Sequence, residues 1–330
     1  MGSALLLVAG ATAAFANAAP TPPDQAADGL AEAHTHGPDP MSLDRRGRPA
    51  AAGPYDVDAH VLWDSSQWDG AVHTADQPDI TSLPTFHAIY LYPRDKASRF
   101  TQFAAMFQAD ARDTARLLGY GRAVRFDERI NTGTRYLDIT VVRSSNTAKK
   151  LGSGNQFSLV SNELTSRGFT NPNKKYVVWL DAPSQYCGQA QLYQDTRRTA
   201  DNYNERRTTT IVYRPYPTTD ASGGFCRGRT LLHELGHNMG ALQRAAPHAF
   251  DGAHCNDSAE DVMCYTSQTS VDTGSPAFDW NNDDYWDPAA NPALAGTERA
   301  QVTLSWWTVN LSRFVCPIAG AACGGENLAP

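Results

Sequence analysis

The chain has 330 residues, of which 41% are hydrophobic and 19% charged, and this length and composition exclude a protein that is disordered throughout. The formal net charge of -7 argues against a nucleic-acid partner, which favours a basic surface. Beyond the N-terminal region, no stretch approaches the roughly 18 uninterrupted apolar residues of a membrane span. We therefore expect a folded, acidic protein with no membrane partner.

The N-terminal region has the composition of a targeting segment followed by a leader. An apolar run over residues 4–15 is followed at 16–18 by Ala-Asn-Ala, which resembles an A-x-A cleavage signal. This pattern predicts a signal peptide over 1–18 and a secreted, extracellular protein, with a buried apolar helix as the alternative. The following residues are rich in Ala, Pro, Gly and Asp, so we expect a pro-segment or flexible region over 19–80 and the catalytic domain over 81–330.

The six cysteines all lie in the C-terminal half of the chain, and their even number fits an oxidising compartment. Closure of short loops favours pairing in sequence order. Zinc-bound thiolates are the alternative, but no C-x-x-C pair occurs. The expected disulfides are Cys187–Cys226, Cys255–Cys264 and Cys316–Cys323.

The central region alternates strand-like and helix-like patterns. Short runs rich in β-branched and aromatic residues predict strands at 87–93, 135–142, 176–183 and 208–217. Between the first two runs, residues 100–118 have apolar side chains at steps of three and four, which predicts an amphipathic helix. This order of elements favours an α/β sandwich.

The segment TLLHELGHNMGALQ, residues 230–243, has the spacing of a zinc-binding helix. His233 and His237 are one turn apart, so both imidazoles project from the same face. Glu234 lies beside them, where a carboxylate can accept a proton from a water molecule at the metal. The leucines of the opposite face can anchor the helix in a core.

Residues 230–265 resemble the metzincin clan of zinc endopeptidases, whose motif is H-E-x-x-H-x-x-G-x-x-H followed by a Met-turn. Gly240 matches the motif glycine, and Met263 matches the turn methionine. The opening HELGHNMG is most similar to the adamalysin (reprolysin) group. Tyr265, two residues after Met263, is similar to astacins and serralysins. The whole string, including APH and DVMCY, also resembles a group of secreted bacterial metzincin-like proteins.

This resemblance implies an α+β zincin fold. In it, a twisted mixed sheet packs with helices above the active-site helix, and a smaller irregular, disulfide-bonded subdomain follows. It also implies that Met263 forms a hydrophobic base beneath the zinc and contributes no ligand. Tyr265 would bind the metal or the oxyanion, as in astacins.

The third ligand departs from the family pattern, because the motif position holds Gln243, whose amide is a poor zinc ligand. We prefer His248, since a longer connection would let Pro247 turn the chain back toward the metal. His254 is the next alternative, because a disulfide at the neighbouring Cys255 would hold it near the turn. Gln243 itself is the third.

The sequence therefore predicts a zinc-dependent endopeptidase that acts on protein or peptide substrates, with Glu234 as the general base. Its single catalytic zinc ion would be held by His233, His237 and His248. Two alternatives stand beside it: a secreted binding or structural protein on an inactive zincin scaffold, and a zinc hydrolase of a nonpeptide substrate. The oligomeric state is not predicted.

Three further patterns lie near the C-terminus. The acidic stretch with Asp279, Asp283, Asp284 and Asp287 has oxygen donors of the kind that bind Ca²⁺, but it does not match the EF-hand pattern. We therefore expect a solvated acidic loop, with a calcium site as the alternative. Asn256 and Asn310 fit the N-glycosylation pattern. Residues 300–314 have helical spacing, with Trp307 on the buried face.

Overall fold

The computed structural model describes the regions of the chain that carry the sheet, its helices and the histidine motif. The expected signal peptide and Tyr265 lie outside the described residues. Within them, no helix is both long and apolar enough to cross a lipid bilayer. The described ranges are 68–117, 122–153, 155–184, 186–214, 229–258, 261–264, 278–279, 284–286 and 307–317.

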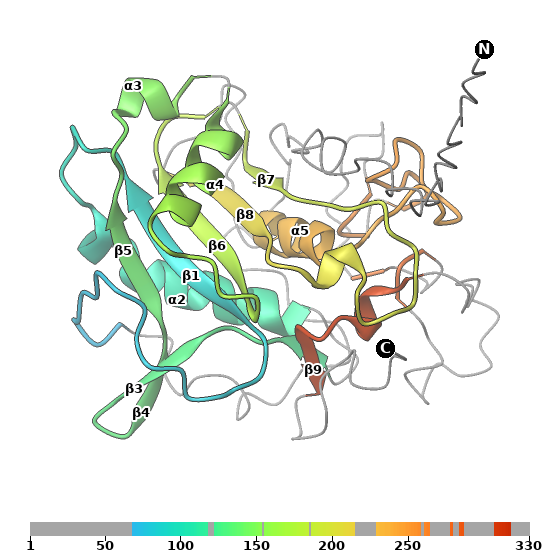
Figure 1. Cartoon of the computed structure of the whole chain (residues 1–330), viewed down its shortest axis with the longest axis horizontal. Coiled ribbons are helices and arrows are strands. Elements are labelled where there is room, and N and C mark those ends of the chain that lie inside the picture. Colours follow the sequence, from blue (N-terminus) through green and yellow to red (C-terminus); the bar gives the residue numbers. More distant parts are fainter. Residues whose placement is uncertain are drawn as a thin grey trace, which may run out of the picture.

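A five-stranded sheet in the order β5-β1-β6-β8-β7 forms the centre of the molecule (Figure 1). The first four strands in this order are parallel, and the short edge strand β7 runs antiparallel to β8. Strands β1 and β6 are buried along nearly their whole length, as expected where both faces of a sheet are covered. The strand bounds are β1 Thr85–Tyr92, β5 Ile139–Arg143, β6 Lys174–Asp181, β7 Gly188–Ala190 and β8 Thr209–Arg214.

Helices cover the two faces of this sheet (Figure 1). Helices α2 (Phe100–Leu117) and α5 (Arg229–Asn238) share a core with one set of strand side chains, in which Phe107 stacks on Trp179 at 4.7 Å between ring centroids. Helices α3 (Ala148–Leu151) and α4 (Gln156–Ser166) pack with the alternate side chains. The result is a three-layer α/β arrangement that buries α5 against the sheet.

The strand predictions hold for β1, β6 and β8, and α2 confirms the predicted helix. The predicted strand at 135–142 is wrong as a single element. It is divided at Asp138, whose backbone N–H donates to Asp127 O, into β4 (Thr134–Leu137) and β5. Strand β4 forms a hairpin with β3 (Glu128–Asn131), which turns at Thr132 and Gly133 with positive φ angles.

The C-terminal segment is not α-helical where it is described. Trp307 is fully buried, as expected, but its backbone N–H donates to Thr196 O. The backbone N–H of Val309 likewise donates to the distant Tyr285 O. These long-range hydrogen bonds replace the i to i-4 bonds of an α-helix. The segment instead has a short 3-10 turn, η5 (Val309–Leu311), and strand β9 (Val315–Pro317), which pairs with β2 (Arg122–Val124).

The disulfide Cys255–Cys264 is present and confirms one of the three expected pairs. Cys187 and Cys316 are also disulfide-bonded, with partners outside the described residues. After α5 the described chain is irregular, apart from η5 and β9, and this disulfide closes a short loop within it.

Candidate metal centre

Helix α5 brings His233 and His237 together in the interior of the molecule. Their side chains are almost completely buried, and their two Nε2 atoms lie 2.8 Å apart. The helix holds this position because its leucines and Met239 enter the core shared with α2 and the sheet. The local i, i+4 spacing and the amphipathic pattern therefore place the pair as the sequence predicts.

The outer nitrogens of these two rings are fixed by backbone carbonyls. His233 Nδ1 donates to Val262 O at 2.7 Å, and His237 Nδ1 donates to Ala241 O at 2.9 Å. A carbonyl oxygen only accepts, so in each neutral ring the proton is on Nδ1 and Nε2 presents its lone pair. Two lone pairs that face each other at this distance repel, and a cation between them removes the repulsion. This arrangement is typical of metal-binding histidines.

His254 completes a group of three imidazoles. Its ring centroid lies 5.3 Å from that of His233 and 5.2 Å from that of His237. One nitrogen from each of the three rings lies within 4.8 Å of the others, and all three side chains are buried. These three histidines can hold a metal ion.

Asp251 orients the third imidazole. Its Oδ1 accepts hydrogen bonds from the backbone N–H groups of Ala253 and His254, and its Oδ2 accepts one from His254 Nδ1 at 2.6 Å. Burial opposes ionisation of this carboxyl, but the hydrogen bond and charge of His254 outweigh it and lower the pKa of Asp251 to about 2. The ionised carboxylate keeps the His254 proton on Nδ1 and directs Nε2 away from it.

The two other candidate ligands, His248 and Gln243, each form a hydrogen bond with another residue. His248 Nδ1 is 3.1 Å from Asp284 Oδ1, and its ring is not in the histidine group. Gln243 Nε2 donates to Asp195 O at 3.0 Å. The preferred ligand of the sequence analysis is therefore not the residue that the structure brings to the site. The chain continues to Asp251, whose carboxylate forms the turn that presents His254.

Met263 lies against α5 on the side of the histidines. An added Cβ at Gly236, between the two helix histidines, would be only 2.7 Å from the Met263 sulfur. Gly236 thus lets the helix rest directly on the methionine side chain. Met263 is fully buried in the same core as the helix leucines.

Glu234, the candidate general base, is fully buried beside edge strand β7. Burial raises the pKa of its carboxyl well above the usual value. A metal ion in the adjacent histidine group would favour its ionised form. Gly188 of β7 leaves the space that the carboxylate occupies, because a Cβ there would be 2.3 Å from Glu234 Oε1. Gly188 is thus a site residue for which the sequence gives no signal.

The donor set fits zinc. Three imidazoles with an open fourth position are a known catalytic zinc arrangement, and each ring here has a hydrogen-bonded Nδ1. Two other groups of potential ligands occur among the described residues. One includes Cys255 and Cys264, which form a disulfide and offer no thiolate. In the other, around His87, the Lys174 ammonium already pairs with the carboxylates of Asp76 and Asp127.

The expected solvated acidic loop is wrong for its described residues, because Asp279 and Asp284 are fully buried. The Asp279 carboxylate accepts the backbone N–H groups of Asp284, Tyr285 and Trp286, which leaves it poorly suited to calcium. Asp283 and Asp287 lie outside the described residues. Among the N-glycosylation candidates, Asn256 is exposed whereas Asn310 is buried.

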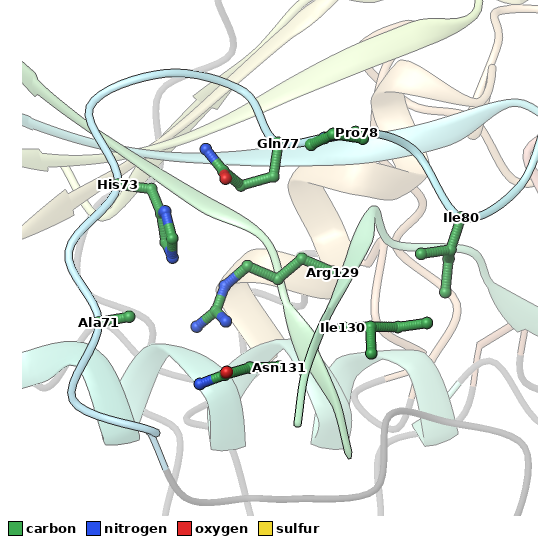
Figure 2. A pocket seen from close by; sticks show the side chains of 8 residues that line it. All are labelled: Ala71, His73, Gln77, Pro78, Ile80, Arg129, Ile130 and Asn131. Atoms are coloured by element: carbon green, nitrogen blue, oxygen red, sulfur yellow. The ribbon is translucent and has the colours of Figure 1, made fainter. Parts of the chain in front are cut away.

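A pocket of about 330 Å³ lies apart from the metal centre, between the segment before β1 and strand β3. Figure 2 shows His73, Gln77, Arg129 and Asn131 around it, with Ile80 and Ile130 at one side. The Arg129 guanidinium pairs with both carboxylate oxygens of Asp69 at 2.7 Å. None of the candidate metal-centre residues lines this pocket.

No protein-family model and no curated protein matches the chain. Among solved structures, it is similar to wild-type OgpA from Akkermansia muciniphila, at 13% identity and a TM-score of 0.36, over 71% of this chain and 68% of that one. A second crystal form of OgpA matches at 13% identity and a TM-score of 0.29, over 57% and 53% of the two chains.

Archaemetzincin from Methanopyrus kandleri matches at 16% identity and a TM-score of 0.30, over 59% of this chain and 89% of that one. Similarity at this level assigns no family and no activity. The chemistry of the site has to be inferred from its own residues.

Proposed function

We propose that the chain is a zinc-dependent endopeptidase in which His233, His237 and His254 hold the metal and Glu234 is the general base. The observation that carries this proposal is the group of three buried imidazoles, with Glu234 next to His233 in the same helix. The likeness of residues 230–265 to metzincins supports peptide bonds as the substrate.

When bound, zinc supplies Lewis-acid polarisation of the peptide carbonyl and lowers the pKa of a water molecule in the open position. The Nδ1 atoms of the three histidines are committed to Val262 O, Ala241 O and Asp251, which leaves their Nε2 atoms to hold the metal. Glu234 accepts a proton from the attacking water on a carboxylate oxygen and returns it to the leaving nitrogen. Burial of Glu234 excludes bulk water from this exchange.

Secretion is part of the proposal. The apolar N-terminal run with its A-x-A-like sequence and the disulfide Cys255–Cys264 both favour an oxidising extracellular environment. Two other functions compete with peptide hydrolysis. One is hydrolysis of a nonpeptide substrate at the same metal, and the other is a binding role on an inactive scaffold.

The proposal is tested with Glu234→Gln and Glu234→Ala in the purified mature protein, using an unfolded protein as substrate. We expect one zinc per chain in the parent and in both variants, and a rate of peptide hydrolysis that falls by a factor of about 10² to 10⁴ in the variants. Zinc in the parent without any proteolysis would favour the nonpeptide hydrolase. A parent protein without tightly bound zinc would contradict the proposal.

A further inference from the structure

A network of buried carboxylates extends beside the candidate metal centre. It includes Asp261, Asp279 and Asp284, each at most 1% exposed. Buried carboxylates are costly unless hydrogen bonds satisfy them, so their partners identify what they hold in place. The partner of Asp284 lies in the loop that carries His254, and a partner of Asp261 lies in the turn that carries Met263.

At one end of the network, Asp284 contacts both the backbone and the side chain of His248. Asp284 Oδ1 accepts a hydrogen bond from the backbone N–H of His248 at 2.9 Å and lies 3.1 Å from His248 Nδ1. The His248 side chain is 37% exposed, whereas that of Asp284 is 1% exposed. The buried partner is therefore the anchor, and His248 is the point of the loop that it holds.

The loop from His248 to Cys255 folds back on itself. Ala249 forms an antiparallel bridge with Cys255, and the Phe250 N–H donates to His254 O at 3.0 Å. The Cys255–Cys264 disulfide holds one end of this loop, and the hydrogen bond from His248 to Asp284 holds the other end. His254 lies between these two points of attachment, so both of them restrict its position.

At the other end, the network reaches the turn below α5. The Tyr285 hydroxyl donates to Asp261 Oδ1 at 2.7 Å, and the same oxygen accepts the Met263 N–H at 2.6 Å. Asp279 joins the two ends, because its carboxylate accepts the N–H groups of both Asp284 and Tyr285. The neighbouring Val262 carbonyl is the acceptor for His233 Nδ1. One hydrogen-bonded unit therefore contacts the surroundings of two of the three histidines.

We propose that Asp284 is a positioning residue that fixes the His254 loop against α5. His248 is the loop residue that Asp284 holds, and it is not a metal ligand. The inference rests on the proposed function, since it takes His233, His237 and His254 as the metal-binding group. Asp284 acts through His248 and the loop backbone and contacts no substrate.

The test compares Asp284→Ala, Asp284→Asn and His248→Ala, with Asp257→Ala as the control. Asp257 Oδ2 lies 3.8 Å from His248 Nδ1, too far for a hydrogen bond, so its replacement removes a nearby carboxylate without removing a hydrogen bond to His248. Zinc affinity is measured by competition with a chelator. Hydrogen exchange of the 245–258 backbone is measured in the metal-free proteins, and exchange of β1 and β6 reports whether the fold persists.

Loss of an orienting partner typically weakens metal affinity 10- to 100-fold, and we expect this loss in Asp284→Ala together with faster exchange over 245–258. Asp284→Asn keeps an oxygen acceptor and should recover most of the affinity. His248→Ala keeps the backbone N–H and should lose less than Asp284→Ala. Asp257→Ala should match the parent.

Parent-like zinc affinity and loop exchange in Asp284→Ala would overturn the inference. A larger zinc loss in His248→Ala than in Asp284→Ala would also overturn it, because it would make His248 a ligand. If Asp284→Ala does not fold, the zinc affinities of Asp284→Asn and His248→Ala are compared instead. A parent protein that binds no zinc would instead contradict the proposed function, and the exchange comparison would still test the anchor.

Discussion

Gly188→Ala is expected to displace the general base without removing the metal. An ideal Cβ at Gly188 would be 2.3 Å from Glu234 Oε1, 2.6 Å from Cγ and 2.7 Å from Cδ. Real Cβ contacts essentially never fall below 3.0 Å, so the carboxylate and β7 must separate by at least 0.7 Å, the difference between 3.0 and 2.3 Å. Glu234 is fully buried, so a shift of this size is strongly opposed by its surroundings.

A misplacement of about 1 Å in a reacting group lowers the rate by a factor of about 10², and we expect a loss of this size in the turnover number. Overpacking of this kind also lowers the free energy of unfolding by about 1–3 kcal/mol. Zinc content should not change, because the hydrogen bonds that orient the three histidines, to Val262 O, Ala241 O and Asp251, do not involve Gly188.

The assay measures hydrolysis of an unfolded protein, zinc content and urea unfolding on the same preparations. Gly152→Ala is the control. Its new Cβ would also be crowded, at 3.2 Å from Ala148 O, but it lies at the end of α3. The control should retain parental turnover. A folded, zinc-loaded Gly188→Ala with parental turnover would refute the assignment of Glu234 as the base held under β7.

Three further predictions concern the orienting carboxylate, the core and a buried acid. Asp251→Ala should weaken zinc affinity 10- to 100-fold in chelator competition, because His254 loses its Nδ1 acceptor; unchanged affinity would argue against His254 as a ligand. Phe107→Ala removes the ring stacked on Trp179 and should lower the free energy of unfolding by about 3–5 kcal/mol in urea titration; a loss below about 1 kcal/mol would contradict the packing. Burial, together with the negative charges around it, raises the pKa of Asp138 from 3.8 to about 6, so the folded state binds its proton more tightly than the unfolded state. Its contribution to stability should therefore fall by about 2 kcal/mol as the pH rises from 4 to 7. Asp138→Asn should remove this dependence in urea titrations across that range, and an unchanged slope would contradict it.

The zinc helix could be predicted because its signal is local. His233, Glu234 and His237 lie within one and a half turns, and the helix geometry alone places both imidazoles on one face. Strands β1 and β6 could also be predicted from the sequence, since buried parallel strands contain runs of β-branched and aromatic residues. Helix α4 was missed although Phe157, Val160 and Leu164 have helical spacing and are buried.

The third imidazole could not be fixed from the sequence, because its position depends on a long loop. Sixteen residues separate His237 from His254, and His248 lies within the same stretch. The structure distinguishes them through a contact that is distant in sequence, because Asp284 holds His248. Strand β7 was missed for another reason, since the sequence Gly-Gln-Ala has no strand signal and its place comes from pairing with β8.

The most direct test of the central claim is the zinc content of the purified parent protein, His254→Ala and His248→Ala, measured by elemental analysis after dialysis. The three imidazoles of the structure predict one zinc per chain in the parent, loss of zinc in His254→Ala and retention in His248→Ala. Retention in His254→Ala together with loss in His248→Ala would contradict this metal centre.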